Sequence, residues 1–198
     1  PETVAKWILS PEPRVANFYG LPKIHKNLQF PAMRPILSAN GSITERISAY
    51  VDTFLNPIMQ QQESFIKDTP HFIQLLSDWS PPSNCPHLTL CTFDVTSLYT
   101  NIPHTDGLFA IQELLLRQYG RIQSHIITRL THITLHNNII HFNGNYYKQI
   151  HGCAMGSKLS PAYACCFMST LEKQWLIQAP IKPILWKRYI DDIIAIFP

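Results

Sequence analysis

Tyr189-Ile190-Asp191-Asp192 stands between two apolar runs, Ile-Leu-Trp at 184–186 and Ile-Ile-Ala-Ile-Phe at 193–197. Apolar runs on both sides of so short a polar step predict a tight β-hairpin with the step at its turn. Strands disfavour Asp, and adjacent carboxylates repel each other, so folding alone does not account for the pair. A bound divalent cation would relieve the repulsion. Asp191 and Asp192 are therefore candidate metal ligands.

The composition is that of a folded globular protein. The chain has 198 residues, 45% of them hydrophobic, which is enough for one large domain or two small lobes. No run approaches the roughly 20 apolar residues that cross a bilayer, and no secretory signal opens the chain. The five cysteines lack a Cys-x-x-Cys spacing, so we expect reduced thiols in an intracellular protein.

Positive charge is unevenly distributed, although the net charge is only +3. Two long stretches, 13–44 and 114–171, contain no acidic residue. The basic residues within them are Arg14, Lys23, His25, Lys26 and Arg34, and then Arg117, Arg121, Arg129, Lys148 and Lys158. Such stretches suit a polyanion that touches several faces of the protein. A basic, solvated surface without a partner is the alternative, and charge alone does not decide between them.

Local signals predict helices and strands in an irregular order. We expect helices from about 43 over four turns after a Ser42–Glu45 capping box, from Thr69-Pro70, over 106–119 and 124–136, and from Ser160-Pro161. A buried strand is expected over 87–95, and Asn143-Gly144 predicts a second hairpin. Because no regular βαβ alternation appears, the fold class is α+β.

Asp94 ends the predicted strand 87–95. Antiparallel pairing of this strand with the hairpin would bring Asp94, Asp191 and Asp192 together. Hard oxygen ligands of this kind suit Mg²⁺ that is held by few protein groups and by substrate phosphates. Two such ions about 3.5–4 Å apart support phosphoryl transfer. Unrelated surface carboxylates are the alternative for these residues taken by themselves.

Four segments together resemble reverse transcriptases. Thr92–Pro103 (TFDVTSLYTNIP) resembles motif A, Gly152–Pro161 (GCAMGSKLSP) motif B, and 189–192 motif C. Phe18–Lys26 (FYGLPKIHK) with Arg34-Pro35-Ile36 resembles the fingers motifs. All occur in the order of the family across most of the chain. The sequences of these segments are similar to those of Penelope-like retroelements, which are relatives of telomerase reverse transcriptase.

The resemblance implies a right-hand polymerase, with a small antiparallel palm sheet and flanking helices. Residues 1–86 would be mainly fingers and 87–198 mainly palm, without a thumb. The implied activity is that of a retrotransposon RNA-directed DNA polymerase, adding dNTPs to a DNA primer on an RNA template. Two Mg²⁺ ions, replaceable by Mn²⁺, would serve as cofactors, and the location would be nuclear, with no membrane contact. The next palm motif and a GIY-YIG endonuclease are not recognised in the sequence.

The resemblance also assigns roles to residues. It makes Asp94 and Asp191 the principal metal ligands, Asp192 the third carboxylate and the Val95 carbonyl a backbone ligand. Tyr99 takes the position of the bulky ring that excludes a 2′-hydroxyl, although a strand aromatic that packs inward is the ordinary reading of such a residue.

Other positions would contact the nucleotide or the nucleic acid. Arg34 and either Lys23 or Lys26 would bind the triphosphate, because guanidinium and ammonium groups complement phosphate oxygens. The remaining implied contacts are Met155 and Gly156 to the nucleotide, and Ser160, Pro161 and Tyr189 to template or primer. Met155 departs from the wider family, in which many members place Gln there.

Two other functions use the same residues. A two-metal nuclease would employ the same carboxylates but leaves Tyr99 and the fingers cations unexplained. A non-catalytic nucleic-acid-binding remnant is the other alternative, and the intact Asp94, Asp191 and Asp192 argue against it. His132, His136 and His141 could suggest a metal site, but no Cys or acidic residue stands near them in the sequence, so we expect ordinary surface roles.

Overall fold

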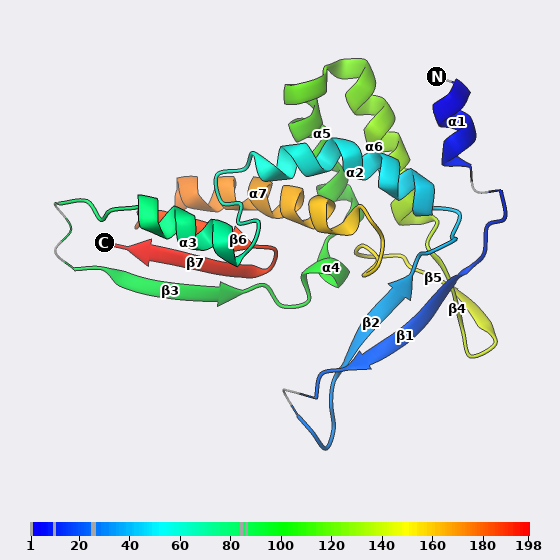
Figure 1. Ribbon diagram of the computed structural model, residues 1–198, viewed down its shortest axis with the longest axis horizontal. Coiled ribbons are helices and arrows are strands. Elements are labelled where there is room, and N and C mark those ends of the chain that lie inside the picture. The colour runs from blue at the N-terminus through cyan, green and yellow to red at the C-terminus, as the bar shows by residue number, and fades with distance from the viewer. Residues whose placement is uncertain (1, 10, 25–26, 84, 86) are drawn as a thin grey trace.

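The computed structural model describes residues 2–9, 11–24, 27–83, 85 and 87–198. Its helices are α1 (Glu2–Ile8), α2 (Glu45–Gln60), α3 (Thr69–Asp78), α4 (Leu98–Asn101), α5 (His104–Tyr119), α6 (Arg121–His136) and α7 (Ser160–Gln178). Its strands are β1 (Ala16–Pro22), β2 (Met33–Ser38), β3 (Thr89–Asp94), β4 (Ile139–Phe142), β5 (Asn145–Lys148), β6 (Leu185–Tyr189) and β7 (Asp192–Phe197). Figure 1 shows two sheets on either side of the short helix α4, beneath a layer of longer helices.

The first sheet is fully antiparallel, in the order β3-β7-β6. Its central strand β7 buries Ile193 and Ala195, which alternate with more exposed residues, as one covered sheet face requires. Residues 64–66 extend the β6 edge, because the Arg188 N–H donates to the Ser64 carbonyl at 2.6 Å and the Ile66 N–H donates to the Arg188 carbonyl at 2.9 Å.

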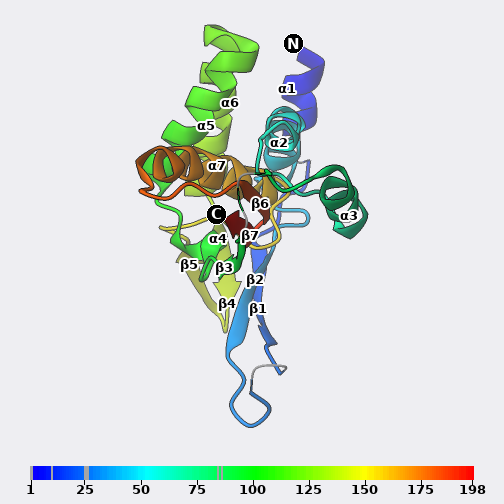
Figure 2. The same cartoon turned by 90° about the vertical axis from the view of Figure 1, so that its left-hand side faces the viewer.

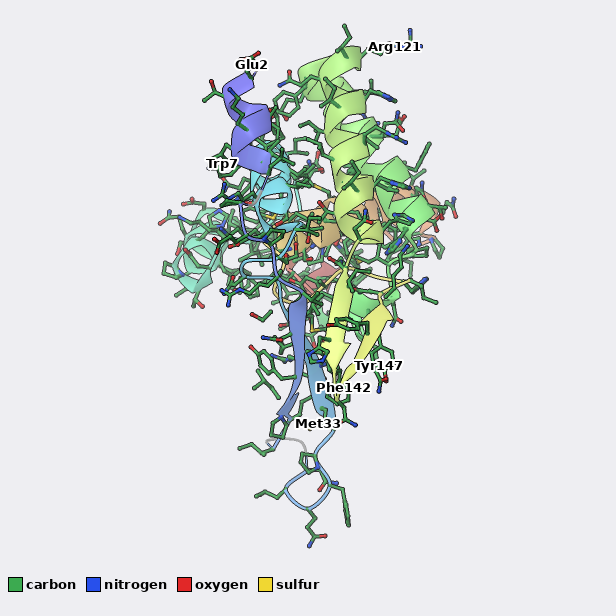
Figure 3. All side chains as sticks on the ribbon, turned by 90° about the vertical axis from the view of Figure 1, so that its right-hand side faces the viewer. Glu2, Trp7, Met33, Arg121, Phe142 and Tyr147 are labelled. Atoms are coloured by element: carbon green, nitrogen blue, oxygen red, sulfur yellow. The ribbon has the colours of Figure 1, made fainter. Side chains whose placement is uncertain are left out.

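The second sheet joins strands from distant parts of the chain in the order β2-β1-β4-β5. β1 pairs antiparallel with β2, and it pairs parallel with β4 at Ala16↔Ile140 and Asn17↔His141. Figure 3 shows Met33 at the outer end of β2, near Phe142 and Tyr147 of the β4–β5 hairpin in the same sheet. Arg121 lies at the opposite end of the molecule in this view. The sheet thus combines segments from both sides of residue 86, and the division into fingers and palm at that residue stays a prediction.

Helices α2, α5, α6 and α7 form the main core, and Figure 2 shows α5 and α6 rising together above α7. The largest fully buried side chains include Leu55 of α2, Ile111 of α5, Ile127 of α6 and Tyr163 of α7. Interdigitated apolar side chains of this kind supply most of the stabilisation of such a domain. The core therefore gives the β6–β7 hairpin a rigid support.

The α+β class, the small antiparallel sheet and its flanking helices agree with expectation, as do the predicted helices and both hairpins. The predicted burial of the strand over 87–95 is wrong, because β3 is an exposed edge strand in which Leu90 retains 64% of its surface. The capping box also differs: Glu45 accepts a hydrogen bond from the Gly41 N–H at 2.7 Å, and the α2 N-cap, Thr44, makes no side-chain cap. Among the described residues, no helix is long and apolar enough to cross a membrane.

Candidate active site at the β6–β7 hairpin

The predicted turn is present, but only Asp191 of the two aspartates lies in it, because Asp192 is the first residue of β7. Tyr189 pairs with Asp192, so Ile190 and Asp191 are the two turn residues. Ile190 has a φ of +56°, a left-handed conformation that a β-branched residue adopts only at a cost. Backbone strain of this kind persists where surrounding contacts hold it, and it is common at functional sites.

Strand pairing brings the carboxylates to the same end of the sheet. Asp94, the last residue of β3, is paired with Asp192 in the antiparallel register. Immediately beyond it, the Val95 N–H donates to the Asp191 carbonyl at 3.0 Å, which ties the end of β3 to the turn. The predicted convergence of these segments is therefore confirmed at the level of the backbone.

A cavity of about 770 Å³ lies next to this end of the sheet. Asp94, Val95 and Asp191 line it together with cations from the β1–β2 region, Lys23 and Arg34. The other predicted site residues in its wall are Tyr99, Met155, Gly156, Ser160 and Pro161. Lys26, the alternative to Lys23, lies outside the described residues.

The electrostatics of the cavity centre on Asp191. Partial burial and the neighbouring charges of Asp192 and Asp94 raise the pKa of the Asp191 carboxyl, while its own backbone N–H and Arg34 act in the opposite direction. Burial and the neighbouring negative charges both disfavour the ionised form of the Asp191 carboxyl, so a positive charge bound in the cavity would stabilise it.

The donor set fits a divalent metal that is only partly held by protein. Two carboxylates line the cavity with Val95, whose carbonyl is the expected backbone ligand. In the described parts of the chain, no group of three or more His, Cys, Asp or Glu side chains is arranged to hold a metal by itself. Mg²⁺ ordinarily takes one or two carboxylates and completes its shell with water and substrate phosphates, so the residues suit this ion.

The loop before α7 lines another part of this cavity, and it is hydrogen-bonded to β2. The Leu37 N–H donates to the Met155 carbonyl at 2.9 Å. Gly156 has a φ of +123°, and a Cβ at this position would overlap the Leu37 carbonyl oxygen. Ser160 is buried and its hydroxyl donates to the Ala154 carbonyl at 2.8 Å, so in this structure the hydroxyl supports the loop and Pro161 is the exposed member of the pair.

Tyr99 lies between the cavity and the helical core. It packs partly buried against the main apolar cluster, while its carbonyl accepts a hydrogen bond from the Cys153 N–H at 2.7 Å. Burial raises the pKa of the Tyr99 phenol far above its ordinary value, with smaller contributions from Cys165, Cys153 and Asp191. The ring is therefore neutral and fixed from behind. Tyr99 thus both packs against the core and lines the cavity.

Asp192 and Tyr189 face a second cavity, of about 650 Å³, which Asp94 also lines. Its other wall includes Asp68, Thr69 and Phe72, at the start of α3. The structure thus separates Asp192 from the cavity that Asp191 lines, in keeping with the lesser ligand role that the resemblance gives it.

Sequence reasoning missed the buried ion pair behind the hairpin. Arg188 donates to Glu172 at 2.7 Å, and each residue retains 2% of its surface. The available signal was an arginine within an apolar strand and the glutamate that ends the acid-free stretch 114–171. His132 and His136 stack with ring centroids 3.9 Å apart, whereas the ring of His141 lies against Tyr146, and none of the three lines either cavity.

Known proteins share both sequence features and fold with this chain. The family model "Reverse transcriptase (RNA-dependent DNA polymerase)" matches residues 24–198. A search of the curated proteins found no match. Apo telomerase from Candida tropicalis superposes with a TM-score of 0.64 at 15% identity, over 99% of this chain and 43% of the telomerase chain.

Two further solved structures share the fold. Telomerase from Candida albicans, in complex with a TWJ fragment of telomeric RNA, has a TM-score of 0.63 at 11% identity, over 94% of this chain and 38% of its own. The RNA-dependent RNA polymerase of a human picorbirnavirus has a TM-score of 0.61 at 15% identity, over 93% of this chain and 36% of its own. The chain thus spans less than half the length of each. These likenesses confirm the fingers-and-palm polymerase fold, and the match over 24–198 shows that the chain belongs to the reverse transcriptase (RNA-dependent DNA polymerase) family.

Proposed function

We propose that this chain is the polymerase portion of a Penelope-like retrotransposon enzyme that adds dNTPs to a DNA primer on an RNA template. The observation that carries the proposal is one cavity lined both by the acidic residues Asp94 and Asp191 and by the cations Lys23 and Arg34. A dNTP has a polyanionic triphosphate and a reacting centre that a metal must reach. This arrangement of charge complements both parts.

The reaction joins the primer to the α-phosphate of the dNTP. The primer 3′-oxygen forms a bond to the α-phosphorus, the bond to pyrophosphate breaks, and the hydroxyl proton leaves. Two Mg²⁺ ions, when bound, activate the attacking oxygen and stabilise the leaving oxygen. Asp94 and Asp191, with the Val95 carbonyl, would hold them, whereas Asp192 borders the second cavity, which Asp94 also lines. The remaining catalysis is positioning and charge stabilisation.

Lys23 and Arg34 would orient the triphosphate. The planar guanidinium of Arg34 can donate two parallel hydrogen bonds to phosphate oxygens, whereas Lys23 offers a compact charge. Burial and the neighbouring carboxylates raise the pKa of the Asp191 carboxyl, and the positive charge of Arg34 opposes this rise.

Another part of the cavity lining would select the nucleotide. The Tyr99 ring would exclude a 2′-hydroxyl, since the core fixes it from behind. Met155 and the close-packed backbone at Gly156 would back the base and sugar, with an adaptable apolar side chain where many relatives place a polar one.

An RNA template is the part of the proposal that the telomerase likeness supports. The Candida albicans structure contains a fragment of telomeric RNA, so a protein of the same fold binds RNA. Support for the Penelope-like subclass comes from the sequences of residues 19–26, 97–103 and 154–157.

Primer extension tests the proposal. The purified protein is given an RNA template, an annealed DNA primer, dNTPs and Mg²⁺, and we expect extension that Asp191→Asn abolishes. Asp106→Asn, which changes an exposed carboxylate on α5, serves as the matched control and should extend like the wild type. Equal extension by wild type and Asp191→Asn would remove the site. Cleavage without extension would indicate a nuclease, and RNA binding without either activity a non-catalytic remnant.

A further inference from the structure

The Arg188 side chain is buried between the β6–β7 hairpin and α7. It belongs to β6, next to Tyr189, and retains 2% of its surface. A fully buried arginine is rare unless its donors are paired. Its guanidinium donates at 2.7 Å and 3.3 Å to the two oxygens of Glu172, at 3.1 Å to the Cys165 carbonyl, at 3.1 Å to Ser169 Oγ and at 2.9 Å to the Ile190 carbonyl.

Glu172 anchors this arginine to helix α7. The other donors to its carboxylate are the Ser64 hydroxyl at 2.7 Å and the Trp186 indole N–H at 3.0 Å. Burial disfavours the charge on Arg188, but the hydrogen bonding and charge of Glu172, together with Cys165, outweigh this effect and raise the pKa of Arg188. The guanidinium is therefore charged, and its pairing with Glu172 connects β6, α7 and the segment at 64–66.

One further hydrogen bond of Arg188 leads to the β6–β7 turn and not to α7. Its acceptor is the carbonyl of Ile190, the residue held at a φ of +56°. That carbonyl belongs to the peptide unit that joins Ile190 to Asp191, and the Asp191 carbonyl in turn accepts a hydrogen bond from the Val95 N–H at 3.0 Å. A single rigid peptide plane thus links the Arg188 guanidinium to the backbone that carries the Asp191 carboxylate.

We propose that Arg188, fixed by Glu172, is a positioning residue that sets the orientation of the Ile190–Asp191 peptide and so of the Asp191 carboxylate. This role rests on the proposed function, in which Asp191 is a metal ligand. The hydrogen bonds from Arg188 to Glu172, Cys165 and Ser169 all lead to α7, whereas the bond to Ile190 leads to the turn that carries Asp191. Groups that orient metal ligands affect metal affinity directly.

The test measures Mn²⁺ binding to the folded protein by electron paramagnetic resonance, which requires no turnover. The central variant is Arg188→Met combined with Glu172→Gln, which removes the buried charges together and deletes the donor to Ile190. Gln still offers an acceptor to the Trp186 indole. Arg188→Lys keeps a cation beside Glu172 but cannot match the forked donors that reach Ile190 as well. Lys187→Met, which removes the neighbouring cation of the same strand, is the matched control.

We expect the double variant to unfold at a temperature near that of the wild type, with its Mn²⁺ dissociation constant raised about tenfold or more. Arg188→Lys should show a smaller increase, and Lys187→Met none. A folded double variant that binds Mn²⁺ like the wild type would overturn the positioning role. If the double variant does not fold, unchanged Mn²⁺ binding by a folded Arg188→Lys protein overturns it equally.

Asp191→Asn separates this proposal from the one on which it rests. Weaker Mn²⁺ binding by Asp191→Asn with normal binding by the Arg188 variants would refute the positioning role alone. Undiminished Mn²⁺ binding by Asp191→Asn would remove the metal site, and the positioning role with it.

Discussion

The Tyr99 ring is fixed by the helical core on one side and lines the Asp94–Asp191 cavity on the other. A rigid ring can exclude a substituent on the incoming sugar only if nothing lets it move aside. Truncation to Tyr99→Ala opens that space, so we expect the dNTP over rNTP selectivity to fall by about 10- to 200-fold, the range in which a pocket discriminates one small group. The measurement is kcat/KM for matched dNTP and rNTP pairs.

Tyr99→Phe is the control for that substitution. It keeps the ring and removes only the phenolic oxygen, so sugar selectivity should stay at the wild-type level. If Tyr99→Ala is folded and discriminates as well as the wild type, the ring does not select the sugar, and its inward packing is then a sufficient explanation.

Gly156 is a second residue where backbone geometry makes a strong prediction. Its φ is +123° and a Cβ would overlap the Leu37 carbonyl oxygen, so Gly156→Ala must move the loop away from β2. The strained conformation alone costs on the order of 1–3 kcal/mol. We expect a lower free energy of unfolding in urea and a raised KM for dNTP, because Met155 and Gly156 line the cavity in which we propose that the dNTP binds.

Gly120→Ala separates strain from the overlap. Gly120 also has a positive φ, +71°, but no atom lies within 4 Å of a Cβ placed there. It should lose stability through backbone strain while its KM for dNTP stays unchanged. A Gly156→Ala protein that behaved like Gly120→Ala would show that the contact with Leu37 has no part in shaping the cavity.

At the scale of elements, local signals in the sequence were sufficient wherever the structure is local. The Asn143-Gly144 turn and the Thr69-Pro70 helix start both encode their own backbone geometry. The exposure of β3 could not be predicted in this way, because an apolar run reads the same in a central strand as in an edge strand. Nor could the partner of Arg188, since Glu172 meets it only when α7 packs against β6.

The same distinction between local and long-range structure applies to the candidate site residues. Motif spacing sufficed to select Asp94, Asp191 and the cavity-lining cations, because their order along the chain resembles the family. Which cavity each side chain faces depends on strand register, and so the separation of Asp191 from Asp192 emerged only from the pairing of β3 with β7.

Helix α3 forms the outer wall of the second cavity, and its start can be tested directly. Asp68 accepts a hydrogen bond from the His71 N–H at 2.9 Å and thereby caps the helix. Asp68→Ala should cost about 1 kcal/mol of unfolding free energy in urea, whereas Asp68→Asn should retain most of it because the amide oxygen can still accept. Equal loss in both variants would mean that the negative charge of Asp68 matters, and not the cap.

At the scale of the whole molecule, the acid-free stretches occupy different structural places. Residues 13–44 include β1 and β2, whereas 114–171 includes α6, the β4–β5 hairpin and the loop before α7. Although they form different elements, both stretches supply strands to the same sheet, β2-β1-β4-β5, and the second also includes α6. The carboxylates of the site belong to the other sheet, β3-β7-β6, and to its turn. A nucleic acid would meet the basic surface of the two stretches through its phosphates, and the metal is required only where the phosphoryl group is transferred.

Binding and chemistry should therefore separate in one experiment. In EDTA we expect an RNA–DNA hybrid to bind by fluorescence anisotropy while primer extension stops. The logarithm of affinity should fall linearly with the logarithm of salt concentration, with a slope of about −0.9 for each phosphate contacted. Arg129 is an exposed residue of α6 that lines neither cavity, and Arg129→Gln should reduce that slope by about 1 if α6 contacts phosphate. Binding that requires Mg²⁺, or that is indifferent to salt, would contradict the separation, because it would place the main attraction at the metal site and not on the basic surface.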